Sequence, residues 1–190
     1  MNYNLVIDVK ATEVSTPTEP VTLAEAKEWC KIELDITEEN TLITELIKTA
    51  RLQVEGFLNI SLVDKTIEAV VNNSLGGIEL PYQPLKSFTS LKDEDGNTLT
   101  VDTDYKLQGV FFKTVKSPCS DYLVATYTTG YTTENPLPKQ FKTAVLQQVA
   151  YLYENRGDTP ANATTQSNKT VPTELSPMVQ LTLSPYRRIW

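Results

Sequence analysis

The chain has 190 residues and a formal net charge of −7; 40% of its residues are hydrophobic and 22% are charged. This composition is that of a globular protein, and no run approaches the roughly eighteen apolar residues of a membrane helix, so we expect no membrane partner. The acidic charge and the pI near 4.7 argue against a protein that grips phosphates through clustered Lys and Arg.

The first 19 residues predict an N-terminal arm. Leu5, Ile7 and Val9 alternate weakly with polar residues, and the Pro, Thr and Glu that follow are typical of an extended arm or an edge strand. The start has no basic segment followed by an apolar stretch, so we expect no secretory signal and synthesis in a cytosol.

A main domain is predicted over residues 20–157, and its first element is a short helix over 22–31. Thr22 and Glu25 have the spacing of a capping box, in which each side chain binds the backbone NH of the other residue. Leu23, Ala26 and either Trp29 or Cys30 then form the buried stripe of this helix.

The clearest helix is predicted over residues 37–58, because its apolar residues recur at three- and four-residue steps. They are Leu42, Ile43, Leu46, Ile47, Ala50, Val54, Phe57 and Leu58. Glu38, Glu39 and Glu45 fall in its first half, while Lys48 and Arg51 fall later, as the helix dipole favours. We interpret these charged residues as a solvated face.

The region 64–130 changes to a period of two and predicts five to seven antiparallel strands. The runs lie at 66–71, 77–81, 86–92, 98–101, 105–108, 110–115 and 121–128. Asp95-Gly96 between two of them is a hairpin signal, since Gly96 tolerates positive φ. Asp93, Asp95 and Asn97 also resemble a calcium loop, but the Gly and Glu positions do not fit, so we predict a turn and no metal site.

A third helix is predicted over residues 138–156. Pro138 suits a first helical turn, an apolar face runs from Phe141 to Tyr153, and Gly157 ends the helix. With the preceding elements this predicts an α+β fold, in which two N-terminal helices and this helix form a helical core and an antiparallel β region is inserted between them.

Residues 158–190 predict an extended C-terminal arm. The link from Asp158 to Thr173 is rich in small polar residues and cannot form a core of its own. The chain regains Met, Leu, Tyr, Ile and Trp from Leu175 onward. A polar link joined to an aromatic and Arg-rich end is typical of a segment that becomes ordered on a partner.

Catalytic and metal-binding signatures are missing from the sequence. There is no histidine, which removes the commonest general base and metal ligand. Cys30 and Cys119 lie far apart without a CxxC partner, so we expect free thiols. With no nucleophile elbow and no glycine-rich phosphate loop, we predict that the chain is not an enzyme and has no cofactor.

Eight short segments, taken in their order and spacing, resemble the head-to-tail connector (adaptor) proteins of tailed bacteriophages. They are 20–27 (PVTLAEAK), 37–43 (TEENTLI), 50–55 (ARLQVE), 79–85 (ELPYQPL), 95–96 (DG), 127–131 (YTTGY), 151–156 (YLYENR) and 185–187 (PYR). The resemblance runs from about Pro20 to the terminus. The long polar link from Asp158 to Thr173 departs from the family pattern.

The resemblance implies a structural virion protein that forms a ring, commonly of twelve copies, beneath the portal and continues the DNA channel to the tail. The implied partners are further copies of the chain, the portal protein, a downstream stopper or tail protein, and genomic DNA that passes through the lumen without sequence-specific binding. The implied location is the neck of the virion, after assembly in the host cytoplasm. The implied docking residues are Leu183, Tyr186, Arg187, Arg188, Ile189 and Trp190.

Two alternatives remain open at the level of sequence. One is another neck or tail-completion (stopper) ring protein, which differs from an adaptor in its partner. The other is a monomeric binding module with a ligand face on its β-sheet.

The acidic charge fits a channel for DNA, because a neutral or negative lumen makes few phosphate contacts and lets DNA slide.

Overall fold

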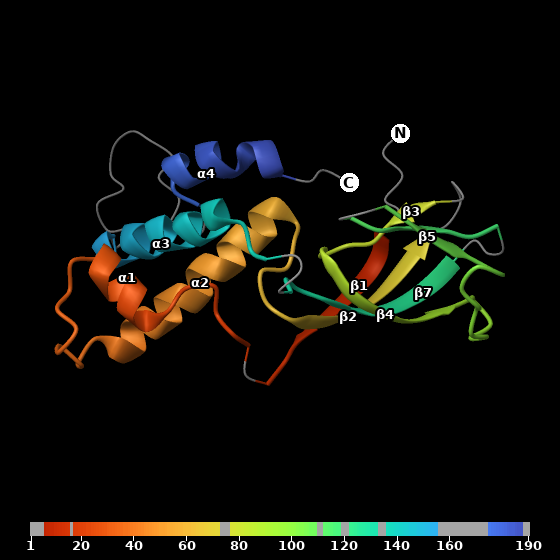
Figure 1. Cartoon of the computed structure of the whole chain (residues 1–190), viewed down its shortest axis with the longest axis horizontal. Helices are drawn as coiled ribbons and strands as arrows, with labels where there is room; N and C mark the ends of the chain where they lie inside the picture. The colour runs from red at the N-terminus through yellow and green to blue at the C-terminus, as the bar shows by residue number, and fades with distance from the viewer. Residues whose placement is uncertain are drawn as a thin grey trace, which may run out of the picture. The chain divides into compact units, whose positions relative to one another are not determined.

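The computed structural model describes residues 6–15, 17–72, 77–109, 112–118, 122–132, 136–155 and 175–187. The chain divides into two compact units, and the predicted domain 20–157 contributes to both (Figure 1). The helical unit consists of residues 19–58 and 137–187, and the β unit is built mainly from residues before Glu19 and from 59–136. Among the described residues, no helix is long and apolar enough to cross a membrane.

In its described residues, the helical unit contains four α-helices and a short 3-10 helix. They are α1 (Leu23–Trp29), α2 (Asn40–Leu58), α3 (Lys139–Glu154), α4 (Pro177–Leu183) and η2 (Ser184–Tyr186). The helices α2 and α3 pack along each other, α1 packs on both, and α4 packs on α3 (Figure 1). The first three match the helices expected from apolar periodicity, whereas α4 lies within the segment expected to be an extended arm.

The capping box at the start of α1 is confirmed. The Thr22 NH donates to Glu25 Oε2 at 2.9 Å, and the Glu25 NH donates to Thr22 Oγ1 at 3.2 Å. The buried residues of α1 are Ala26 and Lys27, while Trp29 is 45% exposed. Trp29 is therefore not part of the buried stripe.

The apolar stripe of α2 is confirmed for most of its members, but the interpretation of Arg51 as solvated is wrong. Arg51 is fully buried; its Nε donates to Glu19 Oε2 at 2.9 Å and its Nη1 donates to Glu55 Oε2 at 3.0 Å. The two carboxylates give the guanidinium charge-assisted hydrogen bonds, so it can be buried without contact with water. Apolar periodicity carries no signal of such pairing.

The described strands of the β unit form two antiparallel sheets, which confirms the α+β fold. The four-stranded sheet has the order β1 (Val6–Glu13), β2 (Lys65–Asn72), β7 (Tyr122–Thr129), β4 (Leu85–Lys92). The three-stranded sheet has the order β3 (Ile78–Glu79), β6 (Thr114–Lys116), β5 (Lys106–Gln108). Residues 6–13 thus form an edge strand, one of the two possibilities for the start of the chain.

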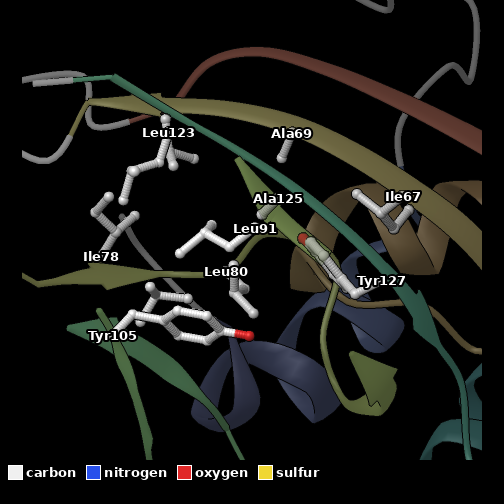
Figure 2. Close-up of a cluster of buried hydrophobic side chains, with 11 residues drawn as sticks. Ile67, Ala69, Ile78, Leu80, Leu91, Tyr105, Leu123, Ala125 and Tyr127 are labelled. Carbon is white, nitrogen blue, oxygen red and sulfur yellow. The ribbon is translucent and has the colours of Figure 1, made fainter. Parts of the chain in front are cut away.

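The core of the β unit lies between the two sheets, and Figure 2 shows their side chains gathered together. Ile67 and Ala125 of the larger sheet and Ile78 of the smaller sheet are fully buried. The buried Tyr127 stacks on Phe88 and donates its hydroxyl to the carbonyl of Pro81 at 2.6 Å. The alternation expected for half-buried strands therefore builds one hydrophobic layer.

The predicted hairpin turn follows β4. The Gly96 NH donates to the Asp93 carbonyl at 3.1 Å, and Gly96 has a φ of 86°. The Asp93 carboxylate accepts from the Asn97 backbone at 2.8 Å, and hydrogen bonds from Asn97 lower the pKa of Asp93. No group of three potential metal ligands occurs within the described ranges.

Candidate docking surface

The segment 175–187 begins with a helix start that its sequence specifies. The Ser176 hydroxyl caps α4 by accepting from the Val179 NH at 3.3 Å, and Pro177 occupies the first turn. A serine cap followed by proline is a favourable helix beginning, because proline has no NH to leave unpaired there.

The inner face of α4 packs on α3. Val179 and Leu183, one turn apart, are both fully buried. The fully buried Gln148 of α3 accepts from the Ser176 NH through Oε1 at 2.9 Å and donates from Nε2 to Gln53 of α2 at 2.8 Å. One glutamine therefore links α2, α3 and the start of α4.

The end of the segment is held by two aromatic contacts. The Tyr186 ring meets the Phe141 ring edge to face, with centroids 5.4 Å apart. The Arg187 guanidinium lies 5.1 Å from the centroid of the Phe57 ring, a cation–π distance. These contacts place the last described residues over the start of α3 and the end of α2.

The outer face of α4 and η2 is apolar and exposed. Met178 is 63% exposed, Leu181 is 73% exposed and Tyr186 is 45% exposed. Met178, Leu181, Tyr186 and the exposed Arg187 are here called the C-terminal surface. Large apolar side chains grouped on one short element are typical of a surface that a partner covers.

The structure places the predicted docking residues in different environments. Leu183 faces inward and has no exposed surface, so it stabilises α4 instead of presenting a contact. Tyr186 and Arg187 lie together at the exposed end of the segment. Arg188, Ile189 and Trp190 lie outside the described residues, and their docking role stays a prediction.

Sequence reasoning did not select Met178 and Leu181 as docking residues. The signal was present, because Ser176-Pro177 marks a helix start and sets the phase of the following turn. In that phase Val179 and Leu183 share one face, while Met178 and Leu181 share another.

A second exposed apolar group lies in the loop between α1 and α2, residues 30–39, here called the acidic loop. Leu34 is 65% exposed and Ile36 is 40% exposed. Lys27, only 2% exposed, donates from Nζ to the carbonyl oxygens of both residues, with the Leu34 contact at 3.2 Å. A buried ammonium therefore fixes the backbone of the loop.

Carboxylates surround the apolar side chains of the acidic loop. Residues 28–39 contain five carboxylates and the single cation Lys31, a net charge of −4. Glu39 accepts from the Tyr153 hydroxyl at 2.6 Å. Burial raises the pKa of Cys30, and the negative charges of Glu154 and Glu39 raise it further. This end of the helical unit is strongly negative.

The β unit has an open hollow of about 460 Å³, lined by residues 103–106 and 116–118. Its polar groups are engaged in the fold: the Asp104 carboxylate accepts from the Thr100 NH at 2.8 Å, and the Ser117 hydroxyl donates to the Asp104 carbonyl at 3.0 Å. The polar groups that line the hollow therefore serve to hold the local backbone.

Comparisons with known proteins agree on a family and a fold. The family model described as "HCP: Head completion protein" matches residues 19–189. The structure is similar to a chain in the neck of an empty gene transfer agent (GTA) particle computed with C6 symmetry, with a TM-score of 0.65 and 16% identity, covering 95% of this chain and 96% of that chain.

Two further structures have the same fold. A chain in the virion of a native GTA particle has a TM-score of 0.66 and 15% identity, covering 95% of this chain and 96% of that one. A chain in the neck of a native GTA particle computed with C12 symmetry has a TM-score of 0.58 and 15% identity, covering 92% and 96%. No curated protein sequence matches the chain significantly.

Proposed function

The chain belongs to the head completion protein family, and we propose that it is a structural connector that joins the head of a phage-like particle to its tail. In this role it forms a ring in the neck of the virion, beneath the portal. The observation that carries the proposal is the family match, which begins at the first residue of the helical unit and runs through the C-terminal surface.

The surface of the helical unit supports a role in assembly. The chain presents apolar side chains on the acidic loop and on the C-terminal surface, where a partner that covers them gains hydrophobic stabilisation. Repeated contacts between identical copies close into a ring when the rotation between neighbours is a whole fraction of a turn. The family is a structural one, and we propose no catalytic role.

The end of the chain is the proposed contact with the portal. Tyr186 and Arg187 are exposed and lead directly into Arg188, Ile189 and Trp190. Aromatic and Arg side chains are the residues that most often anchor interfaces. Leu183 is left out of this contact because its own helical unit covers it.

Binding to portal-bearing heads tests this role. Tail-less heads are mixed with the full chain, with a chain that lacks residues 188–190, and with Tyr186→Ala. We expect the full chain to sediment with the heads, and each change to raise the dissociation constant at least about tenfold, roughly 1.4 kcal/mol. Lys92→Ala, an exposed change in the β unit, is the matched control and should bind normally.

The result also separates the alternatives. A stopper or tail-completion protein would bind only after another neck protein had been added to the heads. A monomeric module would not sediment with heads under either condition. Normal binding without residues 188–190 would contradict the docking assignment while leaving the connector role in place.

The remaining parts of the proposal concern DNA and location. We propose that the ring continues the channel for genomic DNA toward a stopper or tail protein, and that copies fold in the host cytoplasm before they join the neck. The net charge of −7 supports a channel that does not hold DNA, because phosphate affinity comes from Lys and Arg.

A further inference from the structure

We infer that the acidic loop of one copy binds the outer face of α4 of the next copy, so that the chain associates head to tail. This inference rests on the proposed ring and names the surfaces that form each junction. The loop side contributes Leu34 and Ile36, and the α4 side contributes Met178 and Leu181; all four are exposed in the single chain.

The two surfaces lie at opposite ends of one unit. The acidic loop leads directly into the start of α2, where the Asn40 NH donates to the Thr37 carbonyl at 3.1 Å. At the other end of α2, Phe57 contacts Arg187, which follows α4 and η2. The 19 residues of α2 separate these ends by about 28 Å at 1.5 Å per residue.

The separation of the two surfaces decides the symmetry of the contact. A two-fold dimer buries the same patch on both copies, whereas two different patches at opposite ends give a contact that repeats from copy to copy. A repeating contact builds a ring or a filament. The proposed ring therefore needs two such patches on each copy.

The charges of the two surfaces are complementary. Residues 19–58 carry nine carboxylates and four cations, a net charge of −5. In the described part of residues 137–187 the charged side chains are Lys139, Lys142, Arg187 and Glu154, and Glu154 lies at the end of α3 near Cys30. Lys142 is already paired with Glu25 of α1, so Lys139 and Arg187 are the cations that make the α4 side positive where the loop side is negative. This charge complementarity favours a second copy as the occupant.

The acidic loop is held in its conformation by contacts within the single chain. Lys27 holds the backbone carbonyls of Leu34 and Ile36 from inside the unit, so the loop does not need a partner to take its shape. A surface that is ordered before binding loses less conformational entropy when a partner arrives. Arg187 lies at the border between this junction and the proposed portal contact.

Opposite charges at one position test the contact. Self-association of the full chain is measured by sedimentation equilibrium up to millimolar concentration for wild type, Leu181→Glu and Leu181→Lys. Both changes remove the same apolar side chain, so the two variants differ from each other only in the charge that they introduce. We expect Leu181→Glu to weaken association at least tenfold, while Leu181→Lys, which faces carboxylates, stays within about threefold of wild type. The double variant Leu34→Lys with Leu181→Glu should regain association, because each junction then pairs a lysine with a glutamate.

A mixing experiment tests the head-to-tail arrangement. Leu34→Glu disables the loop of one copy, and Leu181→Glu disables the α4 face of another. Each variant alone should stay monomeric, and an equimolar mixture should form a one-to-one dimer and nothing larger, since one working junction remains. Both positions are exposed, so unchanged thermal unfolding of each monomer is the folding control.

The outcomes distinguish this inference from the proposed function. Equal effects of Leu181→Glu and Leu181→Lys, or a mixture without dimers, overturn the head-to-tail contact. Loss of binding to portal-bearing heads by Leu181→Glu with unchanged self-association would assign α4 to the portal instead. A wild-type chain that associates head to tail but never binds heads upholds the contact and overturns the connector role.

Discussion

At the scale of single residues, some charged side chains are among the most buried groups of the helical unit, although hydropathy predicts that they are exposed to solvent. Arg51 and Lys27 are 0% and 2% exposed, yet each lies on a helix whose apolar pattern is otherwise ordinary. Their partners are carboxylates for Arg51 and backbone carbonyls for Lys27. Glu55 is four residues from Arg51 on the same helix, a spacing that the sequence shows. Glu19 and the carbonyls that accept from Lys27 do not follow from helical spacing, because they depend on how the chain returns in space.

Replacement of Arg51 is expected to destabilise the protein strongly. In Arg51→Met, the carboxylates of Glu19 and Glu55 lose the cation between them. Breaking a buried ion pair from one side costs about 3–5 kcal/mol. Urea unfolding measured by circular dichroism checks this value. Lys48→Met, an exposed change on the same helix, is the control and should lie within about 0.5 kcal/mol of wild type; a similar small loss in Arg51→Met would contradict the prediction.

The capping residue Glu25 is expected to make stability depend on pH in the acid range. Its hydrogen bond from Lys142, at 2.5 Å, and the bond from the Thr22 backbone lower its pKa from 4.5 to about 2. Because the folded pKa lies below the unfolded one, the stabilisation is complete above pH 4.5 and is lost as the pH falls toward 2. The pair is more than a third exposed, so we expect about 1 kcal/mol or less.

The measurement compares wild type with Glu25→Gln by urea unfolding at several pH values between 2 and 6. The difference in the free energy of unfolding should be largest above pH 4.5 and should shrink as the pH falls through the acid range. A difference that stays constant across this range would contradict the lowered pKa of Glu25.

At the scale of elements, local signals identified α1, α2 and α3 and most strands, while α4 required tertiary information. The capping box of α1 spans only the four residues 22–25, and the long apolar faces of α2 and α3 repeat over several turns. By contrast, α4 has only seven residues, Pro177–Leu183, and it is stabilised by the burial of Val179 and Leu183 where α4 packs on α3. A helix this short is marginal without such packing.

The docking of α4 is expected to depend on Leu183. Leu183→Ala removes a fully buried side chain and should weaken the packing of α4 by about 2–4 kcal/mol. Hydrogen exchange at the amides of residues 179–183 should accelerate, while amides in the middle of α2 should keep their protection. Leu181→Ala makes the same chemical change at an exposed position and should leave exchange unaltered. Equal effects of the two variants would contradict the assignment of the inner face.

The candidate site was only partly predictable for the same reason. Composition predicts a partner-binding segment within residues 175–190, and Met178, Leu181 and Tyr186 of this segment are exposed. The division between Leu183, which is covered, and Leu181, which is exposed, depends on which side of α4 meets α3. The acidic loop was not selected at all, because exposed apolar residues in a loop cannot be told from buried ones by sequence.

At the scale of the whole molecule, the distribution of charge matters more than its total. The net charge of −7 is compatible with solubility and with a channel that releases DNA. Within the helical unit, however, residues 19–58 have a negative net charge and residues 137–187 have a positive one. We therefore expect self-association of the wild-type chain to weaken as salt rises, since the apolar contacts are accompanied by screened charges.

Weak binding to DNA is expected for the isolated chain. With clustered carboxylates and few adjacent cations, it should bind a short DNA duplex with a dissociation constant above about 0.1 mM at physiological salt, weaker than most non-specific DNA-binding proteins. Fluorescence anisotropy of a labelled duplex provides the measurement. Micromolar binding that declines steeply with salt would contradict the proposed sliding channel.

The buried ammonium of Lys27 has a consequence for genetics. It is buried within its own chain, yet it sets the course of the backbone that carries Leu34 and Ile36. If neighbouring copies meet through that backbone, we expect a screen for mutants that accumulate tail-less heads to recover alleles at codon 27. Such alleles would yield folded but inactive protein, and second-site suppressors would map to the region that encodes α4.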